Sequence, residues 1–294
     1  MTDGSEVAAK TPALAGRLSY PPVVWLNLLC LDAPIVAVAW QWLFGRIFAA
    51  QLTLPVRELL FLTAWLIYLA DRFADIIGLP PESPISLRHR FCRGHMVGWW
   101  IAIVVIFFFD LSIAIRNLDL QMFLLGGTLA ALCFLYLFLN RSLGGKWPLL
   151  PMKEKAIGLL FAAGTALGVV AHLPGLTIAF GVALLLFAIL CTYNCLSIAA
   201  WERELDEAQA KATFMTGWPK AARALDAIGY GLVVAAIGFG LIWRFALPLW
   251  LCLAGSAFLL VRLNNSAHLA RDRRTALADI VMLTPFLVLL FSLR

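Results

Sequence analysis

Residues 59–75 read LLFLTAWLIYLADRFAD, which joins an apolar run to two carboxylates at its end. The two acids, Asp71 and Asp75, are four residues apart, so a helix would place both on one face about one turn apart. The apolar run belongs to a segment, residues 56–76, that is long enough to span a bilayer. A carboxylate near hydrocarbon costs at least a few kcal/mol unless it has a partner. The stretch therefore predicts both a membrane helix and a functional site.

The composition places the whole chain among membrane proteins. Hydrophobic residues make up 62% of the 294 residues, charged residues make up 14%, and the mean hydropathy is +0.89. This apolar share is far above that of a soluble domain, so we predict an all-α, polytopic membrane protein. The net charge of +6 does not indicate nucleic acid as a partner, because basic residues accumulate in the cytoplasmic loops of membrane proteins.

Apolar stretches of about 17–25 residues occur along the entire chain and predict nine transmembrane helices in a bundle around a central, lipid-accessible cavity. The predicted spans are residues 22–44, 56–76, 95–115, 119–140, 153–172, 175–200, 222–243, 246–265 and 276–293. With the N-terminus inside, the inner segments hold 17 of the 23 Lys and Arg and the outer segments hold five. This is the asymmetry of the positive-inside rule. We therefore expect a protein of the bacterial inner membrane with a cytoplasmic N-terminus and an outer C-terminus.

The first residues differ from the rest of the chain. Residues 1–20 are polar and rich in alanine and lack an apolar core, so we expect a cytoplasmic segment and no cleavable signal peptide. Residues 21–294 are expected to form one transmembrane domain. The six cysteines are scattered, mostly within apolar runs. Cys191 and Cys195 have helical spacing, but buried packing is a simpler interpretation of the cysteines than a metal site or a disulfide.

A second acidic pair lies at the end of the sixth predicted span. Glu202 and Asp206 are again four residues apart, in the stretch Glu202-Arg203-Glu204-Leu205-Asp206. The predicted topology puts both pairs at cytoplasmic helix ends, where they open the two longest charged loops, about residues 76–94 and 201–221. The interval of about 130 residues, or four helices, is what a pseudo-repeated bundle would give. We expect the two pairs to face a common site.

Carboxylate pairs on two helices are suited to phosphate chemistry. They can hold between about one and three Mg²⁺ ions, which in turn bind a diphosphate, and cationic side chains would neutralise the phosphate oxygens. A lipid tail on that diphosphate would run into a bundle rich in aromatic rings, whose faces stabilise a passing cation. The combination suits ionisation of an allylic diphosphate in a dry chamber. The cationic candidates are Arg72, Arg88, Lys153, Lys155, Arg203 and Lys211.

Several stretches resemble the motifs of one known family. Residues 71–75 match the latter half of its first motif, N-D-x-x-D-R-x-x-D, and residues 202–206 resemble its second motif, D-x-x-x-D. Leu31-Asp32-Ala33-Pro34-Ile35 is similar to its opening LDKPIG stretch, and Arg88 stands where it has the Arg of an RPL element. The family is the UbiA superfamily of intramembrane prenyltransferases, which has nine helices with aspartate-rich motifs after helices two and six. The resemblance covers nearly the whole chain.

The resemblance implies a cofactor and one substrate. The cofactor is Mg²⁺ and the donor is a prenyl diphosphate, while the acceptor, lipophilic or aromatic, stays open. The metal-binding residues that we expect are Asp71, Asp75, Glu202 and Asp206. Lys153 is favoured because residues 136–153 are similar to the family's Tyr- and Lys-containing connection before helix five, and Lys211 is near the position of a Lys downstream of the second motif. The expected diphosphate-binding residues are Arg72, Arg88, Lys153, Arg203 and Lys211.

The chain also departs from the family pattern. Ile67-Tyr68 replaces the Asn-Asp that opens the first motif, and Glu202 replaces the usual Asp of the second. Asn194 stands about two turns upstream, where an extra acidic residue is often found. The chain therefore has fewer acidic ligands than usual and is a divergent member by this resemblance. The expected substrate-chamber residues are Tyr68, Tyr193, Asn194 and, near the acceptor, Asp32.

Other functions are compatible with parts of this pattern. Some family members cyclise a prenyl diphosphate without an acceptor, and a chain that had lost metal binding would be a non-catalytic lipid-binding protein. The acids could also be simple helix-end charges paired with Arg72 and Arg203. A secondary transporter would carry helix-breaking Gly or Pro at the midplane, whereas the acids here lie at helix ends. A phosphatidyl-alcohol transferase would need a D-x-x-D-G-x-x-A-R signature, into which neither acidic motif continues.

Overall fold

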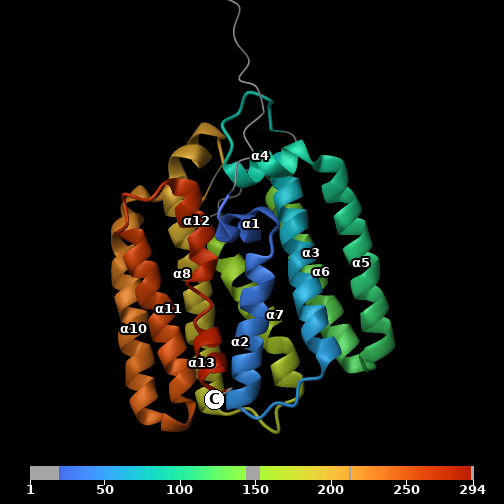
Figure 1. Cartoon of the computed structure of the whole chain (residues 1–294), viewed down its shortest axis with the longest axis vertical. Coiled ribbons are helices and arrows are strands. Elements are labelled where there is room, and N and C mark those ends of the chain that lie inside the picture. Colours follow the sequence, from blue (N-terminus) through green and yellow to red (C-terminus); the bar gives the residue numbers. More distant parts are fainter. Residues whose placement is uncertain (1–19, 78, 144–152, 212, 293–294) are drawn as a thin grey trace, which may run out of the picture.

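A computed structural model describes residues 20–77, 79–143, 153–211 and 213–292. Within these ranges the secondary structure is helical and contains no strand, as predicted. The long helices run side by side along the long axis of the molecule (Figure 1). The predicted polar segment, residues 1–20, lies outside the described residues except for Tyr20.

The first half of the chain forms six helices. They are α1 (Pro22–Leu28), α2 (Asp32–Ile47), α3 (Leu54–Ile76), α4 (Leu87–Gly94), α5 (Met96–Asn117) and α6 (Leu120–Leu143). The second half forms α7 (Lys153–Ala171), α8 (Ile178–Ala208), α9 (Phe214–Gly217), α10 (Leu225–Ile242), α11 (Leu247–Asn264), α12 (Arg271–Ile280) and α13 (Pro285–Ser292). Two 3₁₀ turns, η2 (Pro219–Ala224) and η3 (Arg244–Ala246), precede α10 and α11.

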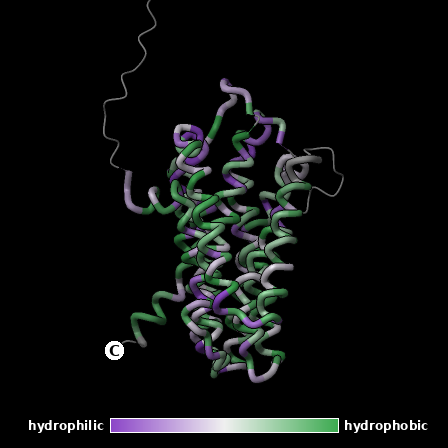
Figure 2. The backbone as a smooth tube through the Cα atoms, turned by 90° about the vertical axis from the view of Figure 1, so that its right-hand side faces the viewer, coloured by the Kyte–Doolittle hydropathy of each residue, from purple (hydrophilic) through white to green (hydrophobic). Residues whose placement is uncertain are grey.

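The protein is a polytopic integral membrane protein. Six helical segments of the described residues are long and apolar enough to cross a bilayer, namely 96–117, 120–139, 153–171, 178–208, 219–242 and 244–264. The pairs α1–α2 and α12–α13 raise this number to eight if each counts as one bent span. Helix α3 is long enough to be the ninth, but charged residues at both of its ends, among them Arg57 and Asp71, make it too polar for the same criterion. The predicted number of nine is therefore not confirmed. Figure 2 shows hydrophobic residues through the middle of the bundle and hydrophilic stretches near its ends.

The first and last predicted spans are each bent and consist of two helices. The segment 22–44 is broken after Leu28, and α1 and α2 meet at 96°. Cys30 in this break has a φ of 56°, a left-handed conformation that ends a helix. The last span begins earlier than residue 276, at Arg271, and bends by 47° before Pro285, because proline lacks the N–H that would continue the helix.

Helix α8 is also longer than predicted. Thr177 caps its N-terminus by accepting from the backbone N–H of Phe180. Its 31 residues extend about 46 Å, which exceeds the roughly 30 Å of a bilayer core. The second acidic pair therefore lies in the last two turns of a continuous helix and does not open a loop. This rigid extension carries Glu202 and Asp206 to the end of the bundle where α4 lies (Figure 1).

Close packing fixes the helices that carry the site. A Cβ added at Gly158 of α7 would lie 2.7 Å from the Cα of Thr192 in α8, so only glycine permits this approach. The largest core cluster joins α2, α7, α8, α10 and α11 around Trp40, Phe187 and Trp250. The indole of Trp40 donates to the carbonyl of Met282 at 2.8 Å and thereby attaches α2 to the bend before α13. All six cysteines are free, and five are buried.

Candidate functional site

Both acidic pairs line one cavity. Asp71 and Asp75 reach it from α3, and Glu202 and Asp206 reach it from α8. Each pair shares a helix face because its members are four residues apart. The cavity has a volume of about 510 Å³. The expectation that the two pairs face a common site thus agrees with the positions of all four side chains.

Helix α4 connects the two acidic helices through adjacent residues. Arg88 Nη2 lies 2.6 Å from Glu202 Oε2 on α8, and His89 Nε2 lies 3.5 Å from Asp75 Oδ2 on α3. The other ring nitrogen of His89 is 2.8 Å from the hydroxyl of Ser86. Burial lowers the pKa of His89 to about 3, so its ring is neutral near pH 7. Because a carboxylate only accepts, the neutral ring donates from Nε2 to Asp75 and accepts from Ser86 at Nδ1.

Three further cations lie around the same acids. Lys211 Nζ is 3.4 Å from Asp75 Oδ2. Lys153, at the N-terminus of α7, lines the cavity and interacts electrostatically with Asp75 and Asp71. Arg72 lines the cavity as well, is 7% exposed, and has a buried Nη1 without a hydrogen-bond partner among the described residues. Positive charge therefore surrounds the acidic end of the cavity, which we call the rim.

Four of the predicted residues have other surroundings and are not among those that line the cavity, namely Arg203, Tyr193, Asn194 and Asp32. The side chain of Arg203 is 37% exposed and pairs with Glu207 at 3.4 Å. Tyr193 is fully buried against α10 and α11 and accepts from Asn264 at 2.9 Å. Asn194 donates to Asp279 at 2.8 Å. Asp32 accepts from Asn27 at 2.7 Å, next to the break between α1 and α2.

Glu154 also belongs to the rim, although it was not among the predicted site residues. It follows Lys153 in α7, lines the cavity and is 4% exposed. Its Oε1 accepts from the backbone N–H of Phe214 at 3.2 Å, and its Oε2 is buried without a partner in the described part of the chain. The signal that could have identified Glu154 is its position as a carboxylate in the first turn of an apolar span. Because Lys153 and Lys155 flank it, the segment has the appearance of a basic helix end.

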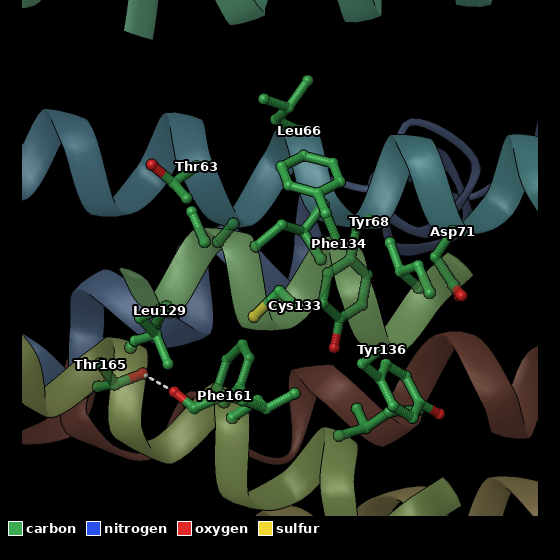
Figure 3. A pocket seen from close by; sticks show the side chains of 18 of the residues that line it. Thr63, Leu66, Tyr68, Asp71, Leu129, Cys133, Phe134, Tyr136, Phe161 and Thr165 are labelled. Carbon is green, nitrogen blue, oxygen red and sulfur yellow. Dashed lines mark hydrogen bonds between the residues drawn. The ribbon is translucent and has the colours of Figure 1, made fainter. Parts of the chain in front are cut away.

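Below the rim the cavity becomes an apolar chamber. Its α3 wall extends from Asp75 down to Val56, a rise of about 28 Å. Tyr68, Phe134 and Phe161 line it, and the rings of Tyr68 and Phe161 meet edge to face at 6.4 Å (Figure 3). No tryptophan of the described residues lines the cavity, and its further aromatic lining residues are Phe107, Phe123 and Tyr136.

The rim offers oxygen ligands rather than a preformed metal cage. Within the described residues no three Asp, Glu, His or Cys side chains converge as a metal site. Carboxylates fit Mg²⁺, which keeps several waters and usually takes only one or two protein carboxylates together with substrate phosphates. Glu202 Oε1 is buried without a hydrogen-bond partner in the described residues and is available as such a ligand.

Comparisons with known proteins give matches at the level of structure. No protein-family model matches the chain, and no curated protein matches it. The apo structure of a UbiA homologue from Aeropyrum pernix K1 superposes with a TM-score of 0.60 at 14% identity and covers 88% of this chain and 98% of its own. A UbiA homologue from Archaeoglobus fulgidus, bound to GPP and Mg²⁺, gives a TM-score of 0.61 at 14% identity, with coverage of 90% and 99%. The resemblance seen in the motifs is therefore confirmed for the fold, and the chain has the fold of the UbiA homologues.

Proposed function

We propose that this protein transfers a prenyl group from a prenyl diphosphate to a lipophilic or aromatic acceptor within the membrane. The observation that carries the proposal is the cavity itself. Two carboxylate pairs from α3 and α8 meet a set of cations at one rim, and an aromatic chamber opens below them. The A. fulgidus protein of similar fold is bound to GPP, a prenyl diphosphate, and to Mg²⁺, which supports both a donor of this class and the metal.

The charges of the rim define where the diphosphate would bind. Asp71, Asp75, Glu202 and Asp206 would hold Mg²⁺, which when bound neutralises charge on a diphosphate. Lys153, Lys211, Arg72 and Arg88 would contact the departing diphosphate, because lysine and arginine stabilise phosphate oxygens by charged hydrogen bonds. All of these residues line one cavity. This common position favours a role in diphosphate binding over the alternative that they are isolated helix-end charges.

The chamber would hold the prenyl chain and protect the reactive carbon. Next to the rim its walls are mainly hydrocarbon and aromatic, which would keep water from the reactive carbon, and the faces of Tyr68, Phe134 and Phe161 can stabilise a developing carbocation. The acceptor then captures this cation. We also propose, from the distribution of basic residues, that the rim faces the cytoplasm and that the membrane is the bacterial inner membrane.

Diphosphate release tests this function. The purified protein in detergent is incubated with geranyl, farnesyl or geranylgeranyl diphosphate, with and without Mg²⁺, and with and without a panel of lipid and aromatic acceptors. We expect Mg²⁺-dependent release that requires an acceptor. Mg²⁺-dependent release with a cyclic or hydroxylated hydrocarbon and no acceptor would instead assign a terpene cyclase of the same superfamily. The absence of release from every donor and acceptor would contradict an enzymatic function.

A further inference from the structure

The outer end of the chamber is polar although it lies far from the rim. The hydroxyl of Thr63 on α3 donates to Asp110 Oδ2 on α5 at 2.8 Å, and both residues line the chamber. Thr63 precedes Asp71 by eight residues, which places it about 12 Å further along α3. Thr165 of α7 and Gln41 of α2 line the chamber too. Figure 3 shows Thr63 and Thr165 on opposite walls, at the end away from Asp71.

The unused oxygen atoms at this end are all hydrogen-bond acceptors or can act as acceptors. Asp110 Oδ1 and Gln41 Oε1 are buried and have no hydrogen-bond partner among the described residues. Thr165 gives its proton to the carbonyl of Phe161 at 2.9 Å, and Thr63 gives its proton to Asp110, so both hydroxyls have acceptor capacity left. Gln41 is 1% exposed and Thr165 is fully buried. We call these four lining residues, Gln41, Thr63, Asp110 and Thr165, the outer polar subsite, in which Thr63 and Asp110 are joined by a hydrogen bond.

The outer polar subsite has no internal counter-ion. No Lys, Arg or His of the described residues lies within ion-pair distance of Asp110. A plain hydrocarbon tail would leave its oxygens unsatisfied, and a buried acceptor without a hydrogen-bond partner is unfavourable. Ionisable residues inside membrane helices mark functional positions for this reason. The chemistry that completes the subsite is a hydrogen-bond donor delivered through the chamber.

We propose that the outer polar subsite binds a hydroxyl group of a lipid in the chamber. A hydroxyl fits better than an ammonium group, because desolvating a neutral donor costs far less than desolvating a charge and three of the four residues are neutral. The hydroxyl has two possible sources. The first is a hydroxyl on the terminal carbon of the prenyl donor, and this source rests on the proposed function. The second is the hydroxyl of a separate lipid alcohol, and this source is independent of the proposed function.

Two prenyl diphosphates test the first source. Binding of farnesyl diphosphate and of its ω-hydroxy analogue is measured with Mg²⁺ in detergent, for the natural protein, Asp110→Leu and Asp110→Asn. One added hydrogen bond predicts that the natural protein binds the hydroxy analogue about tenfold more tightly. Asp110→Leu should lose this ratio and bind the two ligands about equally, because a leucine side chain cannot accept a hydrogen bond. Asp110→Asn, which keeps an acceptor oxygen and a partner for Thr63, should retain the ratio. Because each variant is compared with itself, a loss of fold would be recognised as weaker binding of both ligands.

Dodecanol and dodecane test the second source without any diphosphate. If a separate lipid alcohol is bound, dodecanol should raise the melting temperature of the natural protein and of Asp110→Asn, but not of Asp110→Leu, and dodecane should have no such effect. A preference for hydroxyl in either experiment supports the subsite. Equal binding of the two diphosphates together with equal effects of dodecanol and dodecane overturns it. Failure of both diphosphates to bind contradicts the proposed function, whereas the alcohol experiment still decides the subsite.

Discussion

The two acidic pairs have the same spacing, but in one pair the second carboxylate has the ion-pair partners and in the other pair the first carboxylate has them. On α3 the second member, Asp75, is held by His89 and Lys211, while Asp71 has no ion pair in the described residues. On α8 the first member, Glu202, is held by Arg88, while Asp206 has no ion pair there. Each pair therefore combines one carboxylate that a protein cation anchors through one oxygen, which leaves only its other oxygen for a ligand, with one that has no such ion pair and that we call available.

This difference separates positioning from binding. Arg88 and His89 are neighbours on α4, so a single short helix sets the position of both anchored carboxylates. The side chain of Gln209 also donates to the carbonyl of Pro84, which joins the end of α8 to the segment before α4. We expect substitutions of the available carboxylates to affect activity alone, and substitutions of the anchored ones to affect stability as well.

Loss of the available carboxylates should have the largest effect on turnover. Asp71→Ala and Asp206→Ala each remove a proposed metal ligand, so Mg²⁺-dependent diphosphate release should fall by about a hundredfold or more. The melting temperature should fall less than after loss of an anchored carboxylate, because neither side chain has an ion pair in the described part of the chain. Glu204→Ala is the matched control, since Glu204 lies between Glu202 and Asp206 on the exposed face of α8. Retained turnover in either variant would remove that residue from the site.

Loss of Arg88 should reduce stability and activity together. Glu202 is buried, and removing the partner of a buried charge costs about 3–5 kcal/mol, so Arg88→Ala should lower the melting temperature clearly. The double variant Arg88→Ala/Glu202→Ala should recover part of this loss, because it leaves no unpaired charge. Thermal unfolding of the four proteins in detergent measures the coupling. An additive result would mean that this ion pair does not anchor α8.

The acidic rim was predictable because its signal is local and periodic. The spacing of four residues fixes a common helix face, and the distribution of basic residues places both helix ends on one side. The same periodicity could have separated the residues that lie elsewhere. At about 100° per residue, Arg203 points a quarter turn from Glu202, and Tyr193, nine residues before Glu202, points to the opposite side of α8. Their positions outside the cavity lining follow from that rotation.

Other features depended on contacts that no local pattern encodes. The bend lies at Cys30 and not at a glycine or proline, and it is accompanied by the bond from Asn27 to Asp32. The partner of Asn194 is Asp279, which is 85 residues away. Glu154 became part of the rim because α9 returns to α7 and offers it the N–H of Phe214. Spacing along one helix predicts which residues share a face, but it does not predict which other helices and side chains contact that face.

Glu154 should have an intermediate effect, because it supports the rim from a third helix. Glu154→Leu removes the oxygen that accepts from the backbone N–H of Phe214. The short helix α9, which begins at Phe214, then loses this attachment to α7. A hydrogen bond to a charged group contributes about 1.5–3 kcal/mol, so cleavage by protease near α9 should become faster and turnover should fall about tenfold. Glu154→Gln keeps an acceptor oxygen and should retain most of the protection. Equal protease resistance of all three proteins would show that the contact does not hold α9.

Arg203 should have the smallest effect, and it separates the rim from the outer face of α8. The pair with Glu207 is exposed, and exposed ion pairs contribute only about 0–1 kcal/mol. Arg203→Ala should therefore leave diphosphate release within about twofold of the natural protein, whereas Lys211→Ala, at the rim, should reduce it markedly. Measuring the affinity for inorganic diphosphate in both variants sharpens the contrast. If Arg203→Ala weakened that affinity as much as Lys211→Ala, the guanidinium would have to turn inward when diphosphate binds, and the available carboxylate Asp206 would gain a cationic neighbour from its own helix.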